Sequence, residues 1–342
     1  MPSVRVGLAG FGLAGRFFHA PLIEATDGLT LAAVVTSRRE EVAREHPHAE
    51  VVASVDDLWD SCDLVVVATP NRFHVPMARA AVRHGLPVVI DKPLAVNAAA
   101  AEELVRDAER HDVPLTVFHN RRLDDDFLTV RRLLREGAVG DVVRFESRFE
   151  RFRPQVDATV WRELDREGGV LLDLGPHLVD QALVLFGPVD CVYAEVDARR
   201  AGAEVDDDAF VALAHANGVR SHLRMSAIAP LHGPRLGVSG LDGGVATDGL
   251  DVQEGQLRSG MTPDDPEFGV SDREARLVDA GGERTIPLDR GNYPAFYRAV
   301  VDWLAAGRPP PVDPWDAVTG LRILDAARRS GRDRRVVDLT KS

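Results

Sequence analysis

A histidine and an aspartate lie close together in a segment whose residue types suit proton transfer. The segment Asp173-Leu174-Gly175-Pro176-His177 leads into an apolar stretch, 178–186, that predicts a helix. A histidine can remove a hydroxyl proton near neutral pH, and the positive end of the helix dipole would keep His177 neutral. Asp173 could orient the imidazole or bind a substrate hydroxyl. The alternative is structural, with Asp173 capping the helix and His177 packed at the surface.

Lys92 is the second candidate for chemistry. It follows an apolar stretch, 86–90, at the end of a predicted strand where ligands bind in parallel sheets. An ammonium group there can stabilise a developing alkoxide, although most lysines are solvated residues. Asn120 follows another such stretch, and its amide can both donate to and accept from the hydroxyls of a substrate or a cofactor ribose.

A glycine-rich turn directly follows the first predicted strand. Gly10-x-Gly12-x-x-Gly15 has the spacing of a dinucleotide-binding turn, and Phe11, Leu13 and Ala14 complete it. Gly10 allows the tight turn, Gly12 lets the backbone approach a pyrophosphate, and Gly15 allows close helix packing. The helix N-terminus then presents N–H groups to the phosphates. The alternative is a turn of this composition without a ligand.

The end of the second predicted strand, 29–35, indicates which nicotinamide cofactor fits. NAD-specific sites carry an acidic residue ~20 residues after the glycines. This chain instead has Thr36-Ser37-Arg38-Arg39. A hydroxyl and guanidinium groups suit a 2′-phosphate, so we predict NADP in preference to NAD, with Ser37 and Arg38 as contacts. The alternative is that the two arginines are solvated residues opening the next helix.

These motifs require a scaffold of alternating strands and helices, which residues 1–119 predict. Short Val, Ile and Leu runs at 63–69, 86–90 and 114–118 indicate parallel strands buried on both faces, separated by helices at 74–84 and 97–110. Since ligands bind at the carboxyl ends of such strands, three segments should lie beside the cofactor: Thr69-Pro70-Asn71, Asp91-Lys92-Pro93 and His119-Asn120.

The pattern changes in residues 120–342, which we expect to form a second domain. Residues 142–152 and 219–229 alternate apolar and polar side chains, which is typical of an antiparallel sheet with one packed face. Residues 240–275 are rich in Gly, Asp and Pro and predict loop, and Asp206-Asp207-Asp208 predicts a solvated turn entering a strand. Proline-initiated helices are expected at 294–306 and 314–329.

Composition narrows the classes of partner. A net charge of −13 disfavours nucleic acid and anionic membrane, which both need a basic face. No apolar segment is long enough to span a bilayer, and the first strand leaves no room for a signal peptide, so we expect a cytoplasmic protein. The histidine pair at 46–48 is interrupted by proline and lacks further ligands, so no metal site is expected. A hydrolase is disfavoured because Gly-x-Ser-x-Gly is absent.

Five stretches together resemble the Gfo/Idh/MocA family of nicotinamide-dependent oxidoreductases over nearly the whole chain. They are the glycine turn with Phe17-Phe18-His19-Ala20-Pro21, then Asp91-Lys92-Pro93, His119-Asn120-Arg121-Arg122, Arg151-Phe152-Arg153-Pro154, and Asp173-Leu174-Gly175-Pro176-His177. The His-Asn-Arg-Arg run, the Arg-Phe-Arg-Pro segment and Gly291-Asn292-Tyr293-Pro294 are most similar to the branch containing NADP-dependent scyllo-inositol dehydrogenase. Many members have Glu-Lys-Pro where this chain has Asp91-Lys92-Pro93.

The resemblance implies an N-terminal Rossmann domain, a C-terminal α/β domain with a largely antiparallel sheet, and a homodimer or homotetramer formed through that sheet. It implies catalytic roles for Lys92, Asp173 and His177. It suggests that His74 lies near the cofactor, with a structural role as the alternative, and that His19 supports the glycine turn. Arg153, Trp161 and Tyr293 become candidates for a substrate pocket, with core packing as the alternative.

The implied reaction is hydride transfer between NADP, or NAD, and a cyclic polyol or sugar such as an inositol. Arg121, Arg122, Arg151 and Arg153 could indicate an anionic substrate or could serve the fold. A nicotinamide sensor without turnover should have lost Lys92 or His177, so their presence favours an enzyme. A reaction that retains its cofactor on the same scaffold is a further alternative.

Overall fold

The computed structural model describes residues 3–157, 163 and 168–340, which form two compact units. Unit 1 comprises residues 1–120 together with two later segments, 252–269 and 292–318. Unit 2 comprises residues 121–251, 270–291 and 319–342. Trp161 lies outside the described residues.

Unit 1 is built on a parallel sheet with the order β3-β2-β1-β4-β5-β6. The strands are β1 (Val4–Ala9), β2 (Leu29–Val35), β3 (Glu50–Val52), β4 (Leu64–Val67), β5 (Val88–Asp91) and β6 (Leu115–Phe118). All residues of β4 and β6 are buried, as expected for a parallel sheet covered on both faces. The parallel doubly wound sheet confirms the predicted Rossmann architecture.

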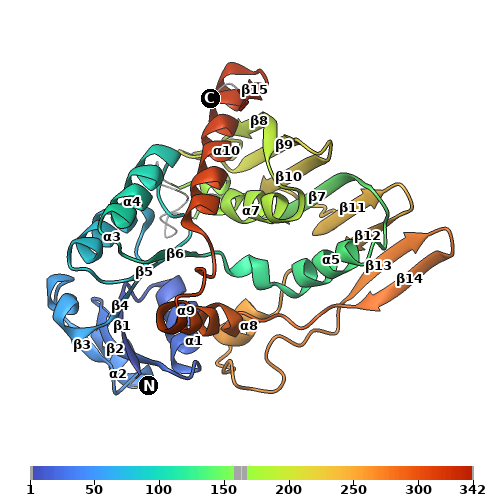
Figure 1. Ribbon diagram of the computed structural model, residues 1–342. Coiled ribbons are helices and arrows are strands. Elements are labelled where there is room, and N and C mark those ends of the chain that lie inside the picture. The colour runs from blue at the N-terminus through green and yellow to red at the C-terminus, as the bar shows by residue number, and fades with distance from the viewer. Residues whose placement is uncertain (1–2, 158–162, 164–167, 341–342) are drawn as a thin grey trace. The chain divides into compact units, whose positions relative to one another are not determined.

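Helices connect these strands. A π-helical turn, η1 (Gly15–His19), runs into α1 (Ala20–Glu24), and α2 (Arg39–Glu45), η2 (Asp56–Ser61), η3 (Asn71–Phe73), α3 (His74–Arg83) and α4 (Ala98–Arg110) follow. Helices α3 and α4 lie against each other (Figure 1). The Asn97 side chain accepts a hydrogen bond from the Ala100 N–H at 2.9 Å and so fixes the start of α4. Later in the chain, α8 (Gln253–Arg258) and α9 (Pro294–Ala306) complete unit 1.

Unit 2 is built on a nine-stranded sheet, counted over the described residues, with the order β14-β13-β12-β11-β7-β10-β9-β8-β15. Its strands are β7 (Val142–Glu150), β8 (Val189–Asp197), β9 (Asp208–His215), β10 (Arg220–Ser226), β11 (Leu236–Gly240), β12 (Gly243–Thr247), β13 (Glu274–Asp279), β14 (Gly282–Pro287) and β15 (Val337–Asp338). Only the β10–β7 pair is parallel among these described strands. The prediction of a largely antiparallel sheet is confirmed.

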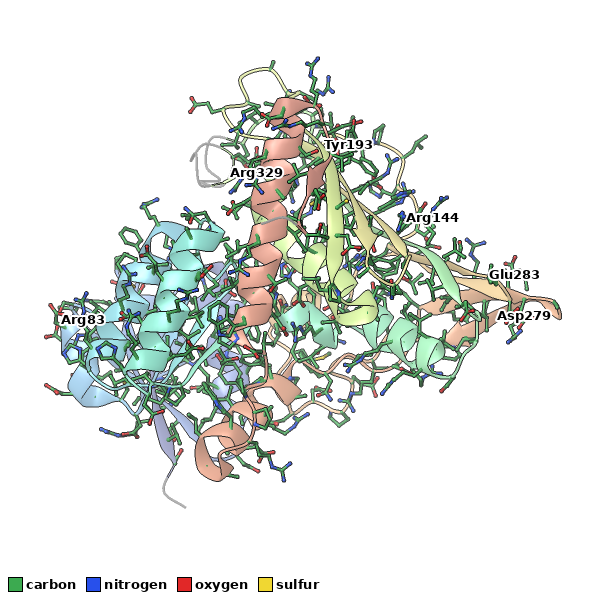
Figure 2. All side chains as sticks on the ribbon, turned by 45° about the horizontal axis from the view of Figure 1, so that its top comes forward. Arg83, Arg144, Tyr193, Asp279, Glu283 and Arg329 are labelled. Atoms are coloured by element: carbon green, nitrogen blue, oxygen red, sulfur yellow. The ribbon has the colours of Figure 1, made fainter. Side chains whose placement is uncertain are left out.

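One face of this sheet is covered by helix. Helix α7 (Gly175–Phe186) contacts β7 and β10 (Figure 1). There, Phe145 of the sheet packs on Phe186 with ring centroids 5.3 Å apart. The other face carries Arg144, Phe210, His222 and Tyr193, since the strand register places them on one side. Figure 2 shows Arg144 and Tyr193 on this sheet, with Asp279 and Glu283 near the end of the β13–β14 hairpin. Other helices of unit 2 are η4 (Asn120–Leu123), α5 (Asp125–Arg135), α6 (Val170–Asp173) and the part of α10 (Pro314–Asp333) from residue 319 onward.

Two expectations about loops are wrong. The segment 240–275 contains β12 and α8, because Gly243 to Thr247 pairs antiparallel with both β11 and β13 and so satisfies its backbone groups in the sheet. Glycine-rich composition did not prevent a strand whose neighbours supply hydrogen bonds on both sides.

The Asp206–Asp208 run is also not a solvated turn. Asp207 is fully buried and accepts hydrogen bonds from the Arg199 and Arg200 backbone N–H groups, while its Oδ2 pairs with Arg200 Nε at 2.9 Å. Asp206 Oδ2 accepts from the Leu171 N–H at the start of α6. These aspartates hold loop and helix ends, and the run enters β9 as predicted.

Helix α10 (Pro314–Asp333) begins at the predicted proline and extends beyond the predicted end. Within the described chain, no helix is both long and apolar enough to cross a membrane.

Candidate functional site

The glycine turn of unit 1 has the close contacts that its spacing predicts. Gly10 has φ of +102°, and a Cβ there would overlap the Ala68 carbonyl. A Cβ on Gly15 would overlap the Gly10 carbonyl oxygen. A Cβ on Gly12 would meet nothing within 4 Å, so open space lies beside the backbone where a pyrophosphate can approach. Phe11 is buried, whereas Leu13 is exposed and Ala14 is half-buried.

The segments that follow the strands meet at one edge of the unit 1 sheet. Strands β1, β4, β5 and β6 are neighbours in that order and all run in the same direction. The glycine turn, Thr69-Pro70-Asn71, Asp91-Lys92 and His119-Asn120 therefore line this edge, as the sequence predicts. Lys92 is half-buried and Asn120 is buried.

Thr69 supplies an unsatisfied hydroxyl at this edge. Its Oγ1 is buried and has no hydrogen-bond partner among the described residues, and its methyl group would lie 3.1 Å from a Cβ on Gly10. A buried polar atom of this kind costs stability unless something binds it. Together with the open space at Gly12, the free hydroxyl fits a bound dinucleotide at the glycine turn.

His74 joins two of the strand-end segments. Its Nδ1 lies 2.8 Å from the Pro93 carbonyl oxygen, and its Nε2 lies 2.8 Å from the Thr69 carbonyl oxygen. Burial lowers the pKa of His74, with Asp91 and the two carbonyl groups acting in the opposite direction. These contacts favour a structural role for His74, which ties the residues after β4 to the Lys92-Pro93 segment after β5.

Asp91 is a charged group beside Lys92. Burial opposes its ionisation, but the contact with His19 and electrostatic interactions with His19, Lys92 and His74 outweigh that penalty and hold the pKa of Asp91 below its usual range. An ionised carboxylate therefore sits next to the lysine that the sequence assigns to catalysis.

The residues predicted to select NADP lie exposed at the end of β2. Ser37, Arg38 and Arg39 are all exposed, and the Arg38 N–H donates to Thr36 Oγ1 at 3.0 Å. The Arg38 guanidinium lies 3.6 Å from Glu41 on a half-exposed surface. Surface pairs of this kind are weak, so the guanidinium can turn toward a phosphate at little cost.

In unit 2, the predicted proton-transfer pair occupies two consecutive helices. Asp173 is the last residue of α6, and His177 lies in the first turn of α7, which begins at Gly175-Pro176 as predicted. The His177 N–H donates to the Leu174 carbonyl at 3.1 Å, and the side chain is buried. A Cβ on Gly175 would lie 2.8 Å from Leu324, so glycine permits close packing at the helix start.

Two of the four arginines weighed as substrate ligands serve the fold of unit 2. Arg122 forms a two-pronged ion pair with Asp180 of α7, at 2.8 Å and 2.6 Å. Arg121 pairs with Asp124 at 3.0 Å, and its carbonyl accepts from Gln181 at 2.9 Å. Because their charges are matched by buried aspartates, these two arginines give no support to an anionic substrate.

The remaining substrate candidates differ in exposure. Arg151 stacks over the Phe149 ring at 4.9 Å, and Arg153 is exposed in unit 2. Tyr293 is fully buried in unit 1, where its N–H donates to Gln253 at 2.7 Å and its ring lies near Phe18. This burial favours the core-packing alternative for Tyr293.

Sequence reasoning missed Tyr297 altogether. Its hydroxyl lies 2.6 Å from His19 Nδ1, although the two residues are 278 positions apart. The only local signal was a tyrosine on the predicted helix 294–306, which does not show what it faces.

Comparison with known proteins matches both parts of the chain to one oxidoreductase family. Residues 4–119 match the oxidoreductase family's NAD-binding Rossmann fold, and residues 131–339 match its C-terminal alpha/beta domain. The chain is 36% identical to the scyllo-inositol 2-dehydrogenase (NADP(+)) IolW of Bacillus subtilis (strain 168), covering 98% of this chain and 96% of that protein. It is 38% identical to the oxidoreductase YdgJ of Escherichia coli (strain K12), over 97% of each.

Comparison with solved structures also finds oxidoreductases. The oxidoreductase yvaA from Bacillus subtilis superposes with a TM-score of 0.93 at 35% identity, covering 99% of both chains. An oxidoreductase from Klebsiella pneumoniae gives a TM-score of 0.92 at 36% identity, covering 100% of this chain and 96% of the other. The chain therefore belongs to the Gfo/Idh/MocA family of oxidoreductases.

Proposed function

We propose that this protein is an NADP-dependent dehydrogenase that oxidises one CH–OH group of a cyclic polyol or sugar such as an inositol, or reduces the corresponding ketone. The observation that supports the proposal is the strand edge of unit 1, where open space at Gly12 and the unsatisfied Thr69 hydroxyl lie on the same sheet edge as Lys92. The full-length similarity to a scyllo-inositol dehydrogenase supports the substrate class.

The dinucleotide cofactor would be held by the glycine turn, by Thr69-Pro70-Asn71 and by Asp91-Lys92, and Ser37 and Arg38 would contact its 2′-phosphate. When bound, it supplies the acceptor for the hydride that leaves the carbinol carbon. Side chains of the protein accept the proton and stabilise the developing negative charge. Oxidation breaks the C–H bond with its electron pair, breaks the O–H bond to release a proton, and forms the C=O bond.

We assign the proton to His177 and the developing alkoxide charge to Lys92. A neutral imidazole at the start of α7 can accept the hydroxyl proton, and Asp173 at the end of α6 orients it or holds a neighbouring hydroxyl. The Lys92 ammonium stabilises negative charge on the reacting oxygen. Asn120 and Arg153 are the remaining candidates for holding substrate hydroxyls. In the reverse direction His177 returns the proton.

An absorbance assay at the reduced-nicotinamide band tests the proposal directly. Inositols, aldoses and uronic acids are each incubated with NADP and with NAD. Signal with neutral polyols and NADP is the expected result. Activity with uronic acids alone would contradict the substrate class, and activity with NAD alone would contradict the assignment of Ser37 and Arg38. A cofactor that copurifies and is never released, with no net NADPH formed, would indicate retained-cofactor chemistry instead.

We also propose that the protein is a cytoplasmic homodimer or homotetramer, with the open face of the unit 2 sheet as the interface. That face mixes charged residues with Tyr193, which is 36% exposed, and with Phe210, whose ring lies under Arg224 at 5.3 Å. Sedimentation of the wild type and of Phe210→Asp tests this. A wild-type monomer would contradict it.

A further inference from the structure

Three side chains from separate elements of unit 1 form a buried polar chain. Tyr297 of α9 places its hydroxyl 2.6 Å from Nδ1 of His19, at the end of η1. On the other side of the imidazole, Nε2 lies 3.6 Å from Oδ1 of Asp91, the last residue of β5. Tyr297 and His19 are fully buried. The first contact is a short hydrogen bond, and the second is an electrostatic contact that ~0.6 Å of closure would turn into a hydrogen bond.

For a neutral His19, the groups at the two ends of this buried polar chain fix where the imidazole proton lies. Burial and the nearby Asp91 charge raise the pKa of Tyr297 well above its usual value, so its hydroxyl remains a donor. Asp91 is ionised and can only accept. A neutral His19 must then carry its proton on Nε2, facing Asp91, and accept from Tyr297 at Nδ1.

Packing fixes the imidazole in this orientation. The His19 ring lies 4.6 Å from the ring of Phe118, measured between centroids, and edge-on to Tyr297 at 6.1 Å. Phe118 of β6 is the register partner of Asp91 in β5. The same strand pair that presents the Asp91 carboxylate therefore also confines the ring that faces it.

Asp91 is joined to Lys92 by one peptide bond, and the two side chains interact electrostatically. A carboxylate that changed rotamer would change the electrostatic field at the ammonium group. Resting on the catalytic role proposed above for Lys92, we propose that Tyr297 and His19 are positioning residues, which hold Asp91 in place and thereby hold Lys92 in its reacting orientation. Neither residue touches the substrate in this assignment.

Tyr297→Phe is the most selective test, because it removes one hydroxyl and keeps the ring contacts with Phe118 and Phe296. Loss of one hydrogen bond should lower kcat by about 3- to 10-fold and change the pH profile of kcat, with the Kd for NADP unchanged. Ser259→Ala is the control, since it removes an exposed hydroxyl of unit 1 that donates to the Gln256 carbonyl at 2.8 Å, and it should leave kcat unchanged.

A double-mutant cycle separates positioning from general stability. If Tyr297 acts through Lys92, Tyr297→Phe should have no further effect on the residual rate of Lys92→Ala. An equal fold-loss in the wild-type and Lys92→Ala backgrounds would overturn the inference. So would wild-type kcat in Tyr297→Phe.

Nitrogen NMR of the histidine rings tests the Tyr297–His19–Asp91 contacts without any need for turnover. At neutral pH the His19 ring should show the Nε2–H tautomer, and Tyr297→Phe should perturb its Nδ1 signal. An Nδ1–H tautomer would overturn the inference even if the enzyme is active. A wild-type protein that is inactive on every polyol would instead refute the proposed function. The His19 tautomer would still show whether the Tyr297–His19–Asp91 arrangement is present.

Discussion

Two residues carry most of the proposed chemistry, and each is placed by a local feature of its own unit. Lys92 directly follows a buried parallel strand, and His177 lies in the first turn of a helix opened by Gly175-Pro176. Both positions follow from element ends, which is why sequence patterns alone could find them.

Removal of either group should lower turnover without removing the cofactor site. Lys92→Ala or His177→Ala is expected to lower kcat by ~10²-fold or more, because alkoxide stabilisation or proton removal is lost. Steady-state kinetics and calorimetric titration of NADP measure the two effects separately. His48→Ala, which changes a half-exposed histidine of unit 1, is the control. Wild-type turnover in either catalytic variant would overturn the assignment.

Arg38 should determine the choice between cofactors. Its guanidinium is exposed at the end of β2, and a charge-assisted contact to a 2′-phosphate should make NADP preferred. We expect Arg38→Ala to lower kcat/KM with NADP by about 10- to 100-fold, with little effect on NAD. Arg44→Ala removes another exposed arginine nearby on α2 and should spare both. Equal catalytic efficiency of the wild type with the two cofactors would contradict this reading.

At the scale of elements, a buried ion pair stabilises α7, the helix of unit 2 that carries His177. The two-pronged pair between Arg122 of η4 and Asp180 of α7 ties the helix that carries His177 to the preceding segment of its own unit. Asp180 is nearly fully buried, and the Arg122 guanidinium offsets its charge.

Breaking that pair should therefore be costly. Arg122→Leu leaves the Asp180 carboxylate buried without its guanidinium, and we expect a loss of about 2–4 kcal/mol in the free energy of unfolding. Urea denaturation followed by tryptophan fluorescence measures it. Arg110→Leu, which removes an exposed partner of Asp107, should cost less than about 1 kcal/mol. Similar losses for the two variants would show that Arg122 does not stabilise α7.

At the scale of the whole molecule, buried histidines make stability depend on pH. Burial lowers the pKa of His215, which is held between the Gly187 carbonyl and Ser221. Below pH ~6.5 the unfolded chain takes up a proton that folded His215 resists, so stability falls as the pH decreases. His74 acts in the same direction.

The expected measurement is a lower free energy of unfolding at pH 5.5 than at pH 7.5, with a smaller difference in His215→Gln. The contribution of one such histidine over this interval is about 1 kcal/mol. Burial raises the pKa of Asp125 and Asp206, which acts in the opposite sense, so the comparison between variant and wild type isolates the histidine. An unchanged difference would show that His215 titrates alike in both states.

The sequence by itself determined the alternation of strand and helix, the glycine turn, the strand-end positions of Lys92 and Asn120, and the start of α7 before His177. It also predicted α9 with the bounds Pro294–Ala306. These features depend on side-chain period and on glycine or proline at fixed offsets, which are local properties of the chain.

Only the tertiary structure decided what lies far apart along the chain but close in space. It placed residues 252–269 and 292–318 in unit 1, turned the Gly-rich 240–275 segment partly into strand and helix, and buried Asp207. It matched Arg122 with Asp180, and His19 with Tyr297 across 278 positions. Local period indicates which side chains are buried but not which partner each one meets, because contacts between distant segments are selected by packing and by the need to satisfy buried polar groups.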